Sequence, residues 1–127
     1  MANYEAKTRS NYFSLKPGKT ESELTTELLS CKSEGQARIV PNEESGKYAV
    51  IINGPCPEEL PEKIRKLIAK DDACIITEIG HESMRYLVGT SIIVTADNVS
   101  YVNLLEFAKT IARETLENKD WDTRMDY

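Results

Sequence analysis

Three segments of the chain repeat apolar residues at the three- and four-residue spacing of a helix with one buried face. Two of these segments begin with the spacing of a capping box, Thr20 with Glu23 and Asn103 with Glu106. The expected buried positions are Leu24, Leu28 and Cys31 in the first helix, Leu60, Ile64, Leu67 and Ile68 in the second, and Leu104, Ala108, Ile111 and Thr115 in the third. We expect the third helix to end near Asn118.

Shorter runs rich in β-branched and aromatic residues lie between these helices, and turn residues bound them, as is typical of strands. The runs cover residues 12–15, 37–40, 47–52, 73–79 and 84–95. Residues 80–83 would form the turn between the last two strands. Gly89 lies inside the last run, where a glycine often marks a bulge or a close approach of another segment.

The predicted order of elements is β-α-β-β-α-β-β-α, without the regular alternation of a parallel sheet. This order favours an α+β fold with one mainly antiparallel sheet of about five strands and helices packed on one face. The other face of the sheet would then be partly exposed. A length of 127 residues is typical of one domain, so we expect residues 1–127 to form a single unit with a short acidic tail at 119–127. The tail contains Trp121 and Tyr127, which can pack back onto the body.

The net charge of the chain limits the classes of molecule that it can bind. A formal net charge of −5 argues against direct binding to nucleic acid, which needs a basic face. The first twenty residues are the exception, because they contain one acidic residue, Glu5, and four basic residues. The basic residues are Lys7, Arg9, Lys16 and Lys19. This local charge suits either an ordinary solvated strand or a small anionic ligand near Arg9.

Cysteine usage and hydropathy point to the cytoplasm. Cys31, Cys56 and Cys74 are odd in number and lack a Cys-x-x-Cys pair, so they indicate buried thiols and not a disulfide framework or a metal site. No run approaches the roughly twenty apolar residues of a membrane span, and the first residues lack a signal-peptide pattern. We therefore expect a cytoplasmic protein without membrane contact, metal or cofactor.

Motifs for catalysis are missing from the sequence. It has no phosphate loop, nucleophile elbow, His-Glu-x-x-His pair or dinucleotide-binding turn. His81 and Glu82 are an acid and a base side by side, but adjacent residues on a strand or turn usually point apart, which favours a polar loop. No catalytic residue is predicted, and a hydrolase using His81 and Glu82 remains the less favoured alternative.

Two short segments combine arginine with tyrosine inside sheet-like sequence: Thr8-Arg9-Ser10-Asn11-Tyr12-Phe13 and Gly80-His81-Glu82-Ser83-Met84-Arg85-Tyr86-Leu87-Val88-Gly89. Arginine offers paired donors for phosphate or carboxylate, and tyrosine offers a flat face for stacking or for a protein partner. If the segments are neighbouring strands, their side chains would converge. The predicted binding residues are Arg9, Asn11, Tyr12, His81, Glu82, Arg85 and Tyr86. In the structural alternative, Arg85 pairs with a carboxylate such as Glu78 while the tyrosines cover the sheet edge.

These two segments together resemble the paired signature of a family of small, largely uncharacterised proteins that travel with phages, plasmids and integrative elements. The resemblance covers the first fifteen residues and about 73–107. It implies an accessory protein of a mobile genetic element that binds a host or element-encoded protein and modulates or inhibits it, with host defence systems among the targets. The alternative function is a small-anion or nucleotide-binding domain, sponge-like in action, that uses Arg9, Arg85, Tyr12 and Tyr86. An exposed sheet face or edge also leaves a homodimer open.

Overall fold

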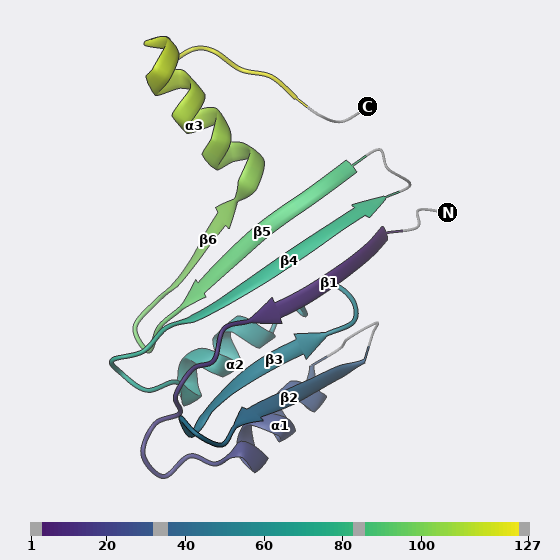
Figure 1. The fold of residues 1–127 in the computed structure, drawn as a ribbon, viewed down its shortest axis with the longest axis vertical. Coiled ribbons are helices and arrows are strands. Elements are labelled where there is room, and N and C mark those ends of the chain that lie inside the picture. The colour runs from purple at the N-terminus through teal and green to yellow at the C-terminus, as the bar shows by residue number, and fades with distance from the viewer. Residues whose placement is uncertain (1–3, 32–35, 83–85, 125–127) are drawn as a thin grey trace.

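The computed structural model describes residues 4–31, 36–82 and 86–124, and it shows an α+β fold built on one open antiparallel sheet (Figure 1). Within these ranges the strands are β1 (Tyr4–Ser10), β2 (Ala37–Asn42), β3 (Lys47–Ile52), β4 (Cys74–Glu82), β5 (Tyr86–Val94) and β6 (Val99–Asn103). The helices are α1 (Glu21–Ser30), α2 (Leu60–Leu67) and α3 (Leu104–Leu116). The predicted fold class and helix positions are confirmed, with a sixth strand added.

The strands lie in the order β2-β3-β1-β4-β5-β6, and each neighbouring pair is antiparallel. The first strand of the chain therefore lies in the middle of the sheet, between β3 and β4. The hairpin of β4 and β5 is the longest part of the sheet, and it extends well beyond the region that α1 and α2 cover (Figure 1).

The core lies between one face of the sheet and the helices α1 and α2. Alternate strand residues such as Val50, Ile76 and Val94 are buried on this face because side chains along a strand point to opposite sides. Leu24 and Leu28 of α1 pack there. Leu60 and Ile64 of α2 pack beside them, as does Ile68, the residue that follows α2. The capping box of α1 is present, since the Thr20 hydroxyl accepts from the Glu23 backbone and the Glu23 side chain accepts from the Thr20 backbone.

The prediction of a first strand at residues 12–15 is wrong. The strand is β1, and residues 12–15 make only isolated bridges from Phe13 to Tyr48 and from Leu15 to Ile68. The inward-facing residues of β1 include Ala6 and Thr8, which are too small or too polar to give the hydrophobic pattern of a strand. Similarly, the predicted turn at residues 80–83 is wrong for 80–82, which continue β4, while residue 83 lies outside the described residues.

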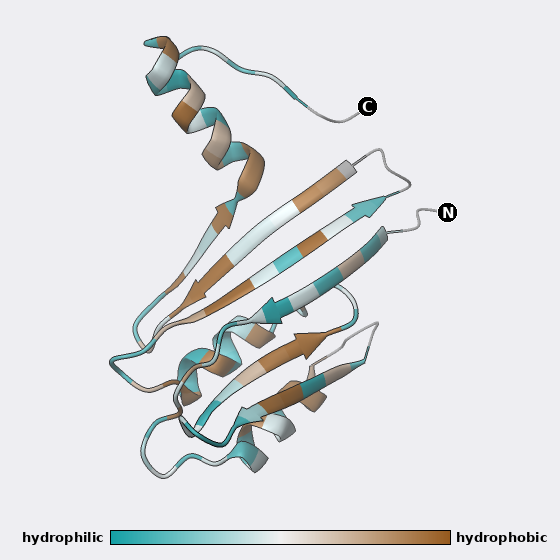
Figure 2. Cartoon of the chain, in the orientation of Figure 1, coloured by the Kyte–Doolittle hydropathy of each residue, from teal (hydrophilic) through white to brown (hydrophobic). Residues whose placement is uncertain are grey.

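The third helix begins where predicted, because the Asn103 side chain accepts a hydrogen bond from the Glu106 backbone. However, the prediction that it packs on the sheet is wrong. α3 extends away from the sheet beyond the end of β6, and its supposed inner residues, including Leu104 and Ile111, are exposed (Figure 1). The physical reason is that α1 and α2 already cover the core face, while α3 starts at the far edge strand. Hydrophobic positions run along this uncovered helix (Figure 2).

The described part of the tail, up to residue 124, contacts α3. Arg113 donates a hydrogen bond from Nε to the carbonyl oxygen of Trp121 over 2.7 Å, and Lys109 forms an ion pair with Asp122 at 3.0 Å. Trp121 is partly buried there. Tyr127, the other aromatic residue of the predicted tail, lies outside the described residues.

Candidate interaction surface

The two arginine and tyrosine segments lie toward opposite ends of a pair of neighbouring strands. β1 and β4 are adjacent, as the hypothesis of converging side chains required, but Arg9 pairs with Thr77 whereas Tyr86 pairs with Glu82. Five residues of strand β4 separate these positions, or roughly 16 Å at the usual rise per residue. Arg85 and the side chain of Tyr86 lie outside the described residues. The structure therefore does not bring Arg9 next to the position of Tyr86.

Asn11 has a structural role in the sheet. Its Oδ1 accepts from the backbone nitrogen of Ile75 at 2.6 Å, and its Nδ2 donates to the backbone oxygen of Ala73 at 3.0 Å. These bonds extend the pairing of β1 with β4 beyond the end of β1. The neighbouring Tyr12 is exposed and, with Arg9, forms the outer part of the predicted site at this end.

His81 and Glu82 both belong to β4, so the predicted polar loop is a strand, but the expectation that their side chains point apart is confirmed. In β4, Gly80 and Glu82 share the face of the core residues, and His81 lies on the opposite face. Nε2 of His81 lies 3.7 Å from a carboxylate oxygen of Glu5, and its Nδ1 makes no hydrogen bond to the described residues. The two side chains therefore do not form an acid and base pair.

Glu78 is a polar centre of the sheet, whereas the sequence suggested it only as a carboxylate partner of Arg85, which lies outside the described residues. Its carboxylate accepts from the Tyr4 hydroxyl at 2.5 Å and from the Cys56 backbone nitrogen at 2.8 Å. Burial and the Glu78 carboxylate raise the pKa of the Tyr4 phenol, and the same two causes raise the pKa of the Cys56 thiol to about 12. Glu78 thus connects β1, β4 and the loop before α2. Its cross-strand neighbour on β5 is Thr90. No local pattern indicated this centre, because it depends on the pairing of β1 with β4.

A group of exposed apolar residues lies where α3 leaves the sheet. We define the apolar platform as Ile79 and Leu87, its sheet part, with Leu104, Phe107 and Ile111, its helix part. Their exposed fractions are 57%, 74%, 63%, 56% and 49% in that order. The strand alternation places Ile79 and Leu87 on the face of the sheet that α1 and α2 do not cover. Leu104, Phe107 and Ile111 share one side of α3, because they are spaced three and four residues apart.

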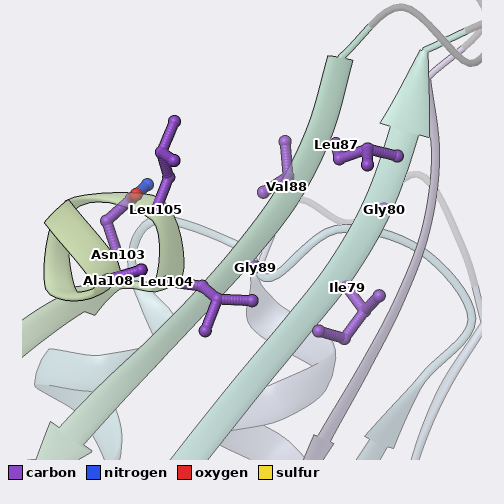
Figure 3. A pocket seen from close by; sticks show the side chains of 9 residues that line it. All are labelled: Ile79, Gly80, Leu87, Val88, Gly89, Asn103, Leu104, Leu105 and Ala108. Carbon is purple, nitrogen blue, oxygen red and sulfur yellow. The ribbon is translucent and has the colours of Figure 1, made fainter. Parts of the chain in front are cut away.

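A hollow of about 370 Å³ lies between the sheet part of the platform and the first turns of α3, where Leu104 lines it (Figure 3). Leu104 lies over Gly89 in this view, and Ile79 follows on the neighbouring strand. A Cβ atom on Gly89 would approach Leu104 to 3.0 Å, so the glycine provides the space in which the first turn of α3 meets the sheet. The hollow is lined by Ile79, Gly80, Leu87, Val88, Gly89, Asn103, Leu104, Leu105 and Ala108. It is almost entirely apolar. Phe107 lies farther round the helix, beside a separate hollow that Tyr101 and Val102 of β6 also line.

Groups suited to other functions are sparse in the part of the chain that the structure describes. No three His, Cys, Asp or Glu side chains gather there to hold a metal ion, and no helix there has the length and apolar character to cross a membrane. The three cysteines are free, with Cys31 and Cys74 buried as predicted and Cys56 partly exposed. No protein-family model, curated protein or solved structure matches the chain.

Proposed function

We propose that this chain is a non-enzymatic interaction protein that acts by binding another protein through the apolar platform. The observation that carries the proposal is the exposed side of α3 beside exposed Ile79 and Leu87. Single exposed apolar residues are normal, but a row of them along one side of a helix, beside an apolar hollow on the sheet, is typical of a contact surface in soluble proteins. An amphipathic helix is also a common recognition element between proteins.

The arrangement of the polar candidates supports a binding role over catalysis. His81 and Glu82 point to opposite faces of the sheet, and Asn11 is engaged in backbone hydrogen bonds. The separation of Arg9 from the position of Tyr86 is the reason that we do not extend the proposal to an anion-binding or nucleotide-binding domain.

The resemblance to proteins of phages, plasmids and integrative elements suggests where the partner belongs. We propose a cytoplasmic accessory protein of a mobile genetic element that modulates or inhibits a protein of its host, with defence systems as one class of target. A net charge of −5 fits this role, because an acidic protein is drawn to a basic surface on its target.

The test is affinity capture from host lysate with tagged wild-type chain and two matched variants. Phe107→Glu places a charge in the platform, while Leu29→Glu places the same charge at a residue of α1 that is 68% exposed and remote from it. We expect a stoichiometric protein partner with the wild type and Leu29→Glu, and its loss with Phe107→Glu. Recovery of the same partners with all three proteins would contradict a role for the platform.

A further inference from the structure

We propose that the apolar platform is the interface of a two-fold symmetric homodimer, in which α3 of each copy packs on the sheet part of the other copy. This inference rests on the proposed function in one respect, because it takes the platform to be a protein-binding surface. It identifies a second copy of this chain as the protein that binds to that surface.

The size of the platform fits a stable dimer. Its five residues together expose roughly 600 Å² on each copy, at about 200 Å² for a fully exposed Leu, Ile or Phe. A specific interface buries roughly 800 Å² per partner, of which somewhat more than half is apolar. The platform with a rim of surrounding polar atoms therefore supplies enough area, and burying it would remove these five exposed apolar side chains from water.

The shape of the chain makes the platform self-complementary. Each copy has a helix that projects from the sheet (Figure 1). One side of this helix is apolar, and so is the sheet surface beside the hollow. α3 points away from the sheet, so beyond its first turn it does not cover Ile79 and Leu87 of its own chain. A two-fold axis places the helix of each copy against the sheet of the other, so that one contact generates its equivalent. A helix of 13 residues is marginal in isolation, and this packing would stabilise α3.

Charges beside the platform also match across such an axis. Lys7 and Arg9 are exposed on β1 and share the face of the sheet part, since Lys7 pairs with Ile79 in the sheet register. Exposed Glu5 lies on the same face, in register with His81, so this border carries two positive charges and one negative charge. Glu106 and Glu114 lie next to Phe107 on α3, one residue before it and two turns after it. Packing α3 on the sheet of a second copy brings this acidic border toward the basic border, which favours the arrangement.

The first measurement is the molar mass of the untagged full chain in solution by sedimentation equilibrium, from about 1 to 100 µM, a range that covers dissociation constants of typical specific dimers. We expect 28.6 kDa, twice the 14.3 kDa of one chain. Phe107→Glu and Leu87→Lys should each weaken the dimer at least about 100-fold, because two charges enter the symmetric interface. Leu29→Glu is the control and should stay dimeric, and circular dichroism checks that every variant is folded.

Mixing the two variants tests the exchange of helix and sheet directly. A pair of one Leu87→Lys chain and one Phe107→Glu chain has one unaltered contact and one contact that sets a lysine near a glutamate. We therefore expect a heterodimer from two variants that are monomeric alone. A Leu87→Lys protein that stays dimeric would overturn this arrangement, as α3 would then pair with something other than the sheet part.

Failure of the dimer and failure of the proposed function give different results. A wild-type chain that is monomeric at every concentration overturns the homodimer, yet the proposed function stands if Phe107→Glu still loses a captured partner. A monomer whose captured partners are the same with Phe107→Glu overturns both. A dimer that Phe107→Glu dissociates supports the homodimer. The proposed function is then supported only if dimeric Leu29→Glu captures a partner that monomeric Phe107→Glu loses.

Discussion

Two glycines in the β4 and β5 hairpin illustrate how single residues position the larger surfaces. Gly80 lies beneath the ring of Tyr4, the residue that donates to Glu78, and Gly89 lies beneath Leu104 at the start of α3. A Cβ on Gly80 would come within 2.7 Å of the Glu5 backbone oxygen, whereas a Cβ on Gly89 meets only side chains. The first glycine therefore accommodates the core side of the sheet and the second accommodates the apolar platform.

Gly80→Ala and Gly89→Ala are the same change on neighbouring strands, and we expect effects of different size on stability. Gly80→Ala should lower the free energy of unfolding by about 2 to 3 kcal/mol, because fixed backbone and a packed ring leave no room for the methyl group. Gly89→Ala should change it by less than about 1 kcal/mol, since the exposed Leu104 side chain can move and alanine suits a strand better than glycine. Urea denaturation compares the two. A Gly89→Ala protein as unstable as Gly80→Ala would show that Leu104 is held rigidly.

The buried thiol of Cys74 predicts a pH dependence of stability. Burial raises its pKa to about 12, against about 9 in an unfolded chain. The folded state therefore holds this proton more tightly, so the contribution to stability is complete below pH 9 and is lost as the pH rises toward 12. From pH 8 to pH 10 this loss is about 1 kcal/mol. Cys74→Ala lacks the thiol, so the difference in unfolding free energy between wild type and variant should shrink by that amount. A difference that stays constant between the two pH values would contradict the assignment.

At the scale of elements, all three helices were predictable in position, and the buried faces of α1 and α2 were predicted correctly, but the packing of α3 was not. Capping pairs at Thr20 and Asn103 are local, so they specify helix starts without reference to the rest of the chain. The apolar repeat in α3 indicates that one side avoids water, yet it has the same form whether the side packs on its own sheet or on another protein. For this reason the sequence identified Leu104 and Ile111 as apolar-face residues but placed them wrongly in the core.

Some strands of the sheet could be predicted from the sequence and others could not. Strands with strong β-branched runs, such as β3 and β5, were predicted from their residues. Strand β1 was not predicted, because its core face carries Ala6 and Thr8. Its central place comes from pairing with β3 and β4 on both sides, a long-range property that local patterns do not report. The candidate site depended on that pairing. Arg9 and Tyr86 were expected to converge if their segments formed neighbouring strands. Strand β4 lies between β1 and β5, and the register that places the two positions far apart along β4 was not visible in the sequence.

At the scale of the whole molecule, packing is concentrated in one half. Every residue of the hydrophobic core comes from the chain before α3, and this core lies between α1, α2 and the adjoining part of the sheet. The far half consists of the ends of β4 and β5, β6 and the uncovered α3 (Figure 2). Stability and binding are thus assigned to different ends of the fold, so that changes at the platform leave the core undisturbed.

A chain shortened to end at Asn103 tests this division. It keeps every core residue and loses α3 with the tail that folds back on it, so we expect a cooperative unfolding transition and no self-association. The matched control is full-length Phe107→Glu, which we expect to be monomeric with its helix present. The free energies of unfolding of these two proteins should agree within about 1 kcal/mol, because the helix contributes little packing to its own chain. Thermal and urea unfolding followed by circular dichroism, with sedimentation on the same samples, provide the comparison. If the shortened chain does not fold while Phe107→Glu does, α3 stabilises its own sheet, and the separation of core from platform is wrong.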